Sequence, residues 1–487
     1  MLNPTYEQLS PFLERYKVIP ISRTIYADII TPINLLRKLA AHSHCYYLLE
    51  SVEGGEKWGR YSFLGYDPTI RFTSKDSHIT IARDGAETEA FDGNPYDAIR
   101  SILKDYSSPR LEGLPPFTGG FVGYFSYESI QYAEPKLKLK KSDTYDMELM
   151  LFDKIIAYDH LQQKIYLIAN MQTAEGEAGL QKAYRALAEI ETLILDTMPL
   201  PEEQAPENVT FSCNVTKEQY CAMVEKTKEY IRQGDIFQAV ISRKFEAPYP
   251  ASLFSAYRVL RTTNPSPYMY FLHGDDIEIA GTSPETLVKL TDGTLYTYPI
   301  AGSRPRGTTE EEDLRLEAEL LQDEKELAEH NMLVDLARND LGKISAFGSV
   351  GVKEYMKINR FSRIMHITST VESQIRPPFD ACDTIAALLP AGTLSGAPKI
   401  RACEIIDELE PSPRGIYGGA IGYIDFSGNL DTCITIRTAV KRGGTVTVQA
   451  GGGIVADSIP EMEYMESENK SLAAKVAIQT ASEVVRK

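Results

Sequence analysis

Two pairs of glutamates in the chain have the spacing of one helical turn. Glu326 and Glu329 lie in a charged segment that runs to His330, and Glu463 and Glu466 lie near the end of the chain. Residues three apart share one face of a helix, so each pair can present two carboxylates to the same ligand. Two such pairs facing each other would offer oxygen ligands to Mg²⁺, which usually keeps waters and also takes substrate oxygens. Taken alone, each pair is more typical of a solvated helix face.

The second glutamate pair follows a run of glycines. Residues 445–449 alternate polar and apolar side chains, which predicts a half-buried strand. Gly451–Gly453 then lack Cβ atoms, so the backbone can turn sharply and a ligand can approach its N–H groups. Ser458–Glu461 has the pattern of a capping box, with Pro460 in the first helical turn. This order could hold an anion beside a divalent cation; a tight turn before a solvated helix is the alternative.

Three further segments carry residue types suited to catalysis or anion binding. His366 stands in an apolar and hydroxyl-rich run, where it is either an acid–base group or a satisfied core histidine. Leu389–Arg401 is rich in small residues, offers the hydroxyls of Thr393 and Ser395, and leads into a helix, which favours anion binding by backbone N–H groups. Arg437 needs a carboxylate partner, from the protein or from a substrate.

The elements that position these residues fall into two regions. Residues 19–165 predict mostly short strands with a few helices, and the acidic, proline-containing segment 196–211 has the composition of a linker. The second region, 212–475, opens with a helix that begins at the Thr216–Gln219 capping box and stops at Gly234.

The end of the second region gives the clearest local prediction. Residues 417–450 read as three strands joined by turns at Ser427–Asn429 and Gly443–Gly444. Arg437 falls in the middle strand, on the same face as Thr435 and Cys433.

Composition limits the functional classes. The 487 residues carry a net charge of −17, which argues against nucleic acid or an anionic membrane as the main partner. An anionic substrate would therefore need local arginines, lysines or a metal. The six cysteines form no CxxC pair, and no secretory or membrane-spanning pattern occurs, so we expect a soluble cytoplasmic protein with reduced thiols. Phosphate-loop, dinucleotide-binding and HExxH motifs are absent.

Taken together, the segments resemble the chorismate-utilising enzymes. The resemblance rests on Asp335–Asp340, Leu389–Arg401, Arg414–Gly422 and Gly451–Lys470, in the family's order along the chain. It covers residues 212–475 closely and the N-terminal region more loosely. The implied fold is of the α+β class, with two antiparallel sheets packed as a sandwich and surrounded by helices. The division at the linker would then be a division of the sequence more than of space.

The resemblance implies a reaction in which chorismate and ammonia give anthranilate and pyruvate. Glu285 is similar to the family's general acid, which protonates the departing 4-hydroxyl and needs a pKa raised by burial. His366 and Thr393 match positions that handle ammonia and the elimination of pyruvate. The implied Mg²⁺ ligands are Glu329 and Glu466, supported by Glu326 and Glu463. The implied chorismate-binding groups are Tyr417, Arg437, the backbone of Gly302 and Ser303, and Gly451, Gly452 and Gly453.

Two positions separate the branches of the family. Isochorismate-forming relatives carry a lysine base where this chain has Gln238, so ammonia is the expected nucleophile here. Aminodeoxychorismate synthases often carry a lysine where this chain has Ala301, so amination at ring carbon 2 is expected over carbon 4. An aminodeoxychorismate synthase remains the nearest alternative, because some such enzymes lack the lysine. A non-catalytic tryptophan-sensing homologue is a third alternative, and the intact glutamates argue against it.

Regulation and partners are also implied by the resemblance. Leu48–Ser51 and Asn264–Met269 match the two segments that form a tryptophan feedback pocket in the family, although Leu48–Ser51 alone could be a plain edge strand. The residues expected to bind L-tryptophan are Glu50, Ser51, Pro267, Tyr268 and Met269. The chain shows no cysteine–histidine glutaminase apparatus. We therefore expect ammonia from a separate glutamine amidotransferase subunit (component II), in a heterotetramer of two large and two small subunits.

Overall fold

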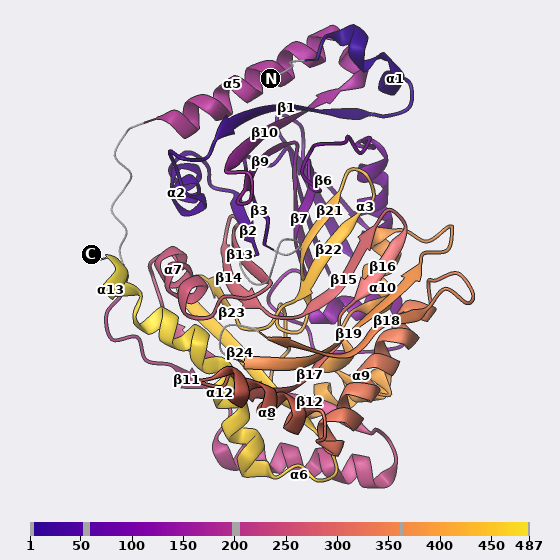
Figure 1. Ribbon diagram of the computed structural model, residues 1–487, viewed down its shortest axis with the longest axis vertical. Coiled ribbons are helices and arrows are strands. Elements are labelled where there is room, and N and C mark those ends of the chain that lie inside the picture. Colours follow the sequence, from indigo (N-terminus) through magenta and orange to yellow (C-terminus); the bar gives the residue numbers. More distant parts are fainter. Residues whose placement is uncertain (1–3, 52–58, 197–204, 361–363, 486–487) are drawn as a thin grey trace.

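Two large antiparallel sheets form the centre of the molecule (Figure 1). The computed structural model describes residues 4–51, 59–196, 205–360 and 364–485. Within these ranges each sheet has 12 strands, and every strand pair is antiparallel. The fold predicted from the sequence is therefore confirmed.

The first sheet combines strands from both regions of the sequence. Its strands, in spatial order, are β1 (Val18–Tyr26), β10 (Lys164–Gln172), β9 (Lys154–Asp159), β3 (Tyr61–Tyr66), β2 (Tyr46–Glu50), β13 (Tyr268–His273), β14 (Ile277–Ser283), β23 (Thr438–Arg442), β24 (Thr445–Ile454), β12 (Gln238–Pro248) and β11 (Ser212–Cys213), with β20 (Gly396–Ala397) paired to β12.

The second sheet also combines strands from the two regions of the sequence. Its strands, in spatial order, are β17 (Ile300–Pro305), β19 (Ile364–Gln374), β16 (Thr294–Thr297), β15 (Thr286–Thr291), β22 (Leu430–Ile434), β21 (Ala420–Asp425), β7 (Gly120–Phe125), β8 (Met147–Phe152), β4 (Ile70–Lys75), β5 (His78–Arg83) and β6 (Glu89–Asp92), with β18 (Gly351–Arg360) paired to β19.

Both sequence regions contribute to both sheets. In the first sheet β2 pairs with β13, and in the second sheet β7 pairs with β21, so each sheet has one seam between the regions. The seams make the regions 19–165 and 212–475 parts of one spatial unit. Of the 196–211 linker, residues 197–204 lie outside the described ranges.

Helices cover the outer faces of the sheets. They are α1 (Ser10–Leu13), α2 (Pro32–His42), α3 (Pro95–Lys104), α4 (Ile130–Ala133), α5 (Glu177–Leu195), α6 (Lys217–Gln233), α7 (Phe254–Thr263), α8 (Glu310–Leu320), α9 (Glu324–Gly342), α10 (Ala381–Leu388), α11 (Lys399–Leu409), α12 (Pro460–Gln479) and α13 (Ala481–Val485). Helix α12 packs on β24, α6 and α7, and α9 packs on β17 and β19. Among the described helices, none combines the length and apolar character needed to span a membrane.

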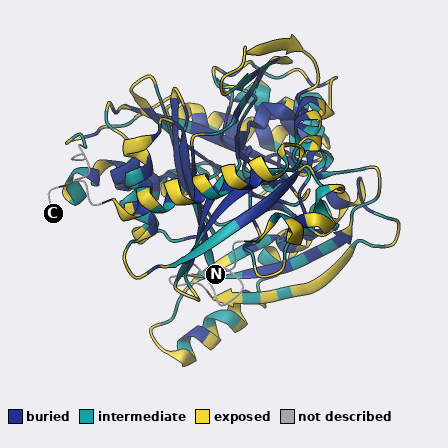
Figure 2. Cartoon of the chain, turned by 90° about the horizontal axis from the view of Figure 1, so that it is seen from above, coloured by how far each residue is buried: buried dark blue, intermediate teal, exposed yellow. Residues whose placement is uncertain are grey.

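Aromatic and aliphatic side chains fill the space between the sheets. Tyr47 of the first sheet meets Phe152 of the second with ring centroids 4.7 Å apart. Phe63 and Val122 belong to the same buried cluster. Figure 2 shows the strands as mostly buried ribbons inside helices whose outer faces are exposed. Burial of this apolar surface on both inner faces is the main favourable contribution to folding.

The local predictions for α6 are confirmed. Thr216 accepts a hydrogen bond from the N–H of Gln219, and the Gln219 side chain reaches back to the Thr216 N–H, which completes the capping box. Gly234 ends the helix at φ +83°, in the left-handed region that a residue without a Cβ enters at little cost.

Two local predictions around the glycine run are wrong. Gly451–Gly453 do not form a loop: they continue β24, with Gly453 opposite Val240 of β12. A Cβ at Gly451 would lie 2.4 Å from the carbonyl oxygen of Ile241, so close approach of neighbouring groups requires the glycine. Ser458 does not cap α12, which begins at Pro460, because its hydroxyl instead accepts a hydrogen bond from the N–H of Val455 and closes the preceding turn.

The prediction of one strand through Arg437 is also wrong. The chain leaves the second sheet at the end of β22 and enters the first sheet at the start of β23, and Arg437 lies in this crossing. Its φ of +53° breaks the extended backbone. Arg437 is thus presented at the junction of the two sheets.

Candidate active site

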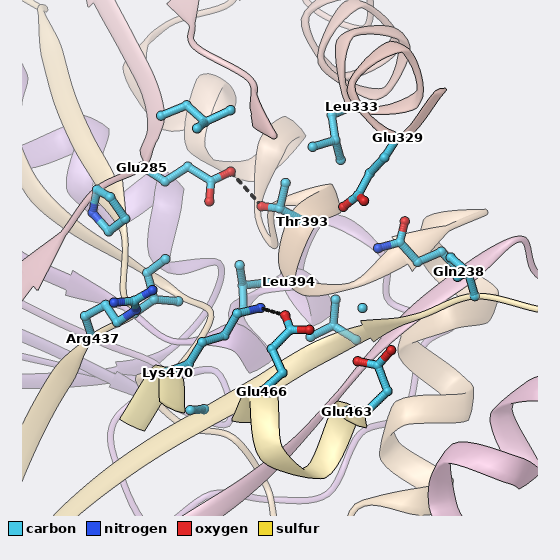
Figure 3. A pocket seen from close by; sticks show the side chains of 18 of the residues that line it. Gln238, Glu285, Glu329, Leu333, Thr393, Leu394, Arg437, Glu463, Glu466 and Lys470 are labelled. Carbon is cyan, nitrogen blue, oxygen red and sulfur yellow. Dashed lines mark hydrogen bonds and ion pairs between the residues drawn. The ribbon is translucent and has the colours of Figure 1, made fainter. Parts of the chain in front are cut away.

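A cavity of about 310 Å³ opens where the two sheets meet, between α9 and α12 (Figure 3). It is lined by Gln238, Val240, Pro284, Glu285, Ile300, Lys325, Glu329, Leu333, Thr393, Leu394, Tyr417, Ile436, Arg437, Gln449, Ala450, Gly451, Gly453, Val455, Ser458, Glu463, Glu466 and Lys470. Most of the residues predicted to do chemistry are brought together here, from segments far apart in the sequence.

Glu285 lies in the cavity wall, in the two-residue connection between β14 and β15. Thr393 Oγ1 donates a hydrogen bond of 2.8 Å to its Oε1 atom. Burial raises the pKa of Glu285 to about 7, although the Thr393 hydrogen bond and the Lys470 ammonium act in the opposite direction. The carboxyl can therefore carry a proton near neutral pH, as a general acid must.

Three glutamates reach the opposite side of the cavity. Glu329 comes from α9, and Glu463 and Glu466 come from α12. Desolvation and the nearby Glu326 raise the pKa of Glu329, and desolvation raises the pKa of Glu463. Glu463 Oε2 is buried and, within the described part of the chain, has no hydrogen-bond partner. These features favour a cation between the helices.

The donor set fits Mg²⁺ only if the substrate completes it. Within the described ranges, no three Asp, Glu, His or Cys side chains converge closely enough to hold a metal by themselves. Mg²⁺ is commonly bound by one or two carboxylates together with waters and substrate oxygens. These glutamates can supply the carboxylates. Glu326 does not line the cavity; its carboxylate lies 3.8 Å from Arg304 Nη1.

Arg437 provides the cationic side of the cavity. Its guanidinium has no hydrogen-bond or ion-pair partner among the residues that the structure describes. Burial lowers its pKa, while the nearby Tyr417 acts to raise it. A guanidinium held in such a cavity can bind a carboxylate. Figure 3 shows Arg437 and Lys470 on one side and Glu329 and Glu463 on the other.

Besides Glu326, four of the predicted residues lie outside the lining. Gly302, at φ +62°, forms a bulge in β17, and its carbonyl oxygen lies 2.9 Å from His366 Nδ1. Ser303 pairs with His366 across β17 and β19. Burial lowers the pKa of His366, which favours the neutral imidazole. Gly452 is not part of the lining, and a Cβ there would lie 2.9 Å from Glu463 Oε2.

Polar lining residues that were not predicted from the sequence include Lys470 and Gln449. Lys470 lies one turn after Glu466 on α12, and its Nζ is 2.6 Å from Glu466 Oε1. The i,i+4 spacing was a usable signal for this pair. Gln449 lies two residues before Gly451 on the same face of β24, so the period of the strand could have placed it beside the glycines.

The predicted inhibitor segments meet at the seam of the first sheet. Glu50 of β2 pairs with Met269 of β13, and its carboxylate is fully buried. The carboxylate accepts hydrogen bonds from Arg261 Nε and Nη2, both at 2.9 Å, and from the Tyr257 hydroxyl at 2.7 Å. Tyr268 donates a 2.8 Å hydrogen bond to Asp431. Ser51 and Pro267 are partly exposed beside this polar cluster.

Comparison with known proteins places the fold and cavity in one class. A family model of the chorismate binding enzymes matches residues 45–475, and the chain belongs to this family. The match starts well before residue 212, where the close resemblance in the sequence begins.

Curated proteins similar to this chain include anthranilate synthase component 1 chains. The chain is 46% identical to that of Acetivibrio thermocellus over 99% of this chain and 100% of the relative. It is 42% identical to that of Bacillus subtilis over 98% of this chain and 96% of the relative. Anthranilate synthase component I from Streptococcus pneumoniae superposes with a TM-score of 0.78 at 35% identity, covering 93% of this chain and 99% of that one.

Proposed function

We propose that the protein is the large subunit of an anthranilate synthase, which converts chorismate and ammonia to anthranilate, pyruvate and water. The observation that carries this proposal is the charge pattern of the cavity. A protonatable Glu285, the guanidinium of Arg437 and three carboxylates face a space of about 310 Å³. Chorismate has two carboxylates and one hydroxyl leaving group, and this pattern provides a group for each. The full-length similarity to anthranilate synthase component 1 chains supports the same reaction.

The residues divide the chemistry between them. Arg437 and Tyr417 bind the side-chain carboxylate and fix the ring. Ammonia attacks ring carbon 2, the double bond shifts, and the 4-hydroxyl departs as water with the proton of Glu285. Loss of the proton on carbon 2 and cleavage of the ether bond then give anthranilate and pyruvate. Gln238 lines the cavity, and its amide cannot act as the base that activates water, which favours ammonia as the nucleophile.

Mg²⁺ is part of the proposal. Glu329 and Glu466, supported by Glu463, would hold the ion, which when bound would neutralise and position the ring carboxylate. Lys470 now pairs with Glu466 and would be free to contact the substrate once a cation takes its place.

The direct test is incubation of the purified chain with chorismate, Mg²⁺ and ammonium, with products separated by chromatography. Anthranilate and pyruvate in equal amounts are the expected products. A 4-amino product without pyruvate would instead identify an aminodeoxychorismate synthase, and no turnover would contradict an enzymatic role. Glutamine in place of ammonium is expected to give no product from this chain alone. Activity with glutamine should return with a separate amidotransferase subunit, in the proposed cytoplasmic heterotetramer of two large and two small subunits.

Glu466→Gln is expected to raise the Mg²⁺ concentration needed for half-maximal activity at least tenfold, about 1.4 kcal/mol of binding free energy. The substitution removes one anionic oxygen that faces the proposed cation and leaves the helix intact. Glu461→Gln is the matched control, because Glu461 lies on the same helix but is exposed and outside the cavity. Protection of the fold against heat by Mg²⁺ with chorismate should be lost in the first variant only. Equal Mg²⁺ dependence in both variants would contradict the assignment.

Ser51→Phe is expected to weaken tryptophan inhibition roughly five- to a hundredfold while kcat is retained. Ser51 lies beside the buried Glu50 and Tyr268 cluster, and overpacking of such a site costs about 1–3 kcal/mol. Ser51→Ala is the small-residue control and should keep inhibition. Calorimetric titration with L-tryptophan measures the effect without turnover. Unchanged tryptophan affinity in the phenylalanine variant would remove these segments as the regulatory site.

A further inference from the structure

A buried ion pair contacts the backbone of the cavity wall and plays no part in the chemistry described above. Arg414 is 4% exposed and Glu410 is 3% exposed. Arg414 Nη2 lies 2.6 Å from Glu410 Oε1, and Arg414 Nε donates to Glu410 Oε2 at 2.9 Å. A buried pair of this kind gains little net stability over an apolar pair of the same shape, because both charges lose their hydration.

The remaining donors of Arg414 fix the backbone of two segments of the cavity wall. Nη2 donates to the carbonyl oxygen of Val240 at 2.6 Å, and Nη1 donates to that of Leu394 at 2.5 Å. Val240 and Leu394 both line the cavity. Leu394 directly follows Thr393, whose hydroxyl donates to Glu285. The guanidinium thus holds in place the segment that orients the acid.

Glu410 extends the same network to a third segment. Its Oε1 accepts hydrogen bonds from Ser242 N at 2.7 Å and from Ser242 Oγ at 2.8 Å. Since the Ser242 hydroxyl proton is directed to Glu410, the Ser242 oxygen must accept the 2.9 Å hydrogen bond from Gln449 Nε2. This order of donors fixes which end of the Gln449 amide faces Ser242.

The other end of that amide is then available to the cavity. Gln449 lines the cavity, and within the described part of the chain its Oε1 has no recorded partner. It is not among the buried atoms that lack a partner, so this oxygen is accessible. An amide oxygen can only accept hydrogen bonds, so it suits a donor such as ammonia or the chorismate hydroxyl, and not a carboxylate.

We propose that Arg414 and Glu410 form a positioning pair for the proposed reaction. Arg414 holds the Thr393–Leu394 segment against Glu285, and Glu410, through Ser242, orients Gln449 so that its Oε1 accepts a hydrogen bond from a donor on ammonia or chorismate. The inference rests on the proposed function. Neither member of the pair lines the cavity.

Arg414→Lys tests the first half. Lysine keeps the charge but loses the planar fork that reaches Glu410 and both carbonyl oxygens at once. We expect kcat to fall at least tenfold in the folded enzyme, with L-tryptophan affinity unchanged. Arg100→Lys is the matched control: Arg100 bonds Asp380 and Asp383 at 2.6 Å, and lies outside the cavity. A lower melting temperature in both variants with kcat unchanged in both would overturn this half.

Ser242→Ala tests the second half and leaves the Arg414–Glu410 pair in place. We expect KM to rise about three- to tenfold for one substrate, and Gln449→Met to do the same. A rise for ammonium identifies ammonia as the donor, and a rise for chorismate identifies its hydroxyl. The double variant should be no worse than Gln449→Met alone, because both substitutions remove one interaction. Unchanged KM values for both substrates, or additive effects, would overturn the proposal. If the parent enzyme does not turn over chorismate, the proposed function itself fails.

Discussion

Glu285→Gln is expected to lower kcat by roughly 10²–10⁴-fold, the usual contribution of a positioned acid. Glutamine keeps the size of the side chain and can still accept the Thr393 hydrogen bond, but it has no proton to give to the departing hydroxyl. Steady-state assays with saturating chorismate and ammonium measure the loss. Retention of more than a tenth of the parent activity would exclude Glu285 as the acid.

The pH dependence gives the same residue a second test. An acid with a pKa of about 7 is protonated below that pH, so kcat/KM for chorismate should fall as pH rises through about 7. The assay must hold the concentration of un-ionised ammonia constant, so that only the protein titrates. In Glu285→Gln the residual activity should no longer fall as pH rises through about 7. The same fall of kcat/KM with pH in the variant would assign the titration to another group.

The free energy of unfolding distinguishes the loss of the acid in Glu285→Gln from damage to the fold. Burial raises the pKa of Glu285 from 4.5 to about 7, so the folded chain binds this proton more tightly than the unfolded chain. The resulting stabilisation is complete below pH 4.5 and is lost as pH rises through about 7. A shift of this size corresponds to about 3 kcal/mol. Glu285→Gln should therefore gain stability relative to the parent above pH 7, measured by denaturant unfolding, while it loses activity.

Arg437→Met is expected to weaken chorismate binding by about 2–5 kcal/mol, roughly 30-fold or more in the dissociation constant. The substitution removes the guanidinium assigned to the side-chain carboxylate, and methionine fills a similar volume. Both residues carry a Cβ, so the strain at φ +53° is common to both and cancels. Chorismate binding can be measured by calorimetry in the absence of ammonium.

The same substitution should stabilise the free protein. In the described part of the chain the Arg437 guanidinium is left without a partner, and an unsatisfied buried polar group costs about 1–3 kcal/mol. Arg442→Met is the control, because Arg442 is paired with Asp276 at 2.8 Å and lies outside the cavity. It should leave chorismate affinity unchanged. Lower stability of Arg437→Met together with normal chorismate affinity would contradict the assigned role.

Individual helices could be predicted from the sequence better than the way in which they pack against one another. The α6 helix carries its start and stop signals within its own residues, and the structure has both. The glutamates at 329, 463 and 466 could be placed on helices because i,i+3 spacing is local. That α9 and α12 face one cavity depends on the order of strands in two sheets, which no local pattern records.

The incorrect predictions share a physical cause. Gly451–Gly453 resemble a loop because glycine is common in turns, but they are required by β12 and by Glu463, which approach them in space. Arg437 sits in a run with strand character, and its left-handed backbone arises because the chain passes there from one sheet to the other. The orientation of Gln449 depends on Ser242 and Glu410, which come from two other parts of the chain. In each case tertiary contacts override the local preference.

The seams between the sequence regions have a consequence for biosynthesis. When residues 1–196 have left the ribosome, the residues of β2 and β7 have been synthesised. Their partners β13 and β21 have not. Two apolar strand edges stay unpaired until the second region is translated, which is the situation that favours association between nascent chains. Severing the polypeptide at the linker would leave the same edges open. Both regions are thus needed to complete each sheet, although the sequence divides readily into two regions.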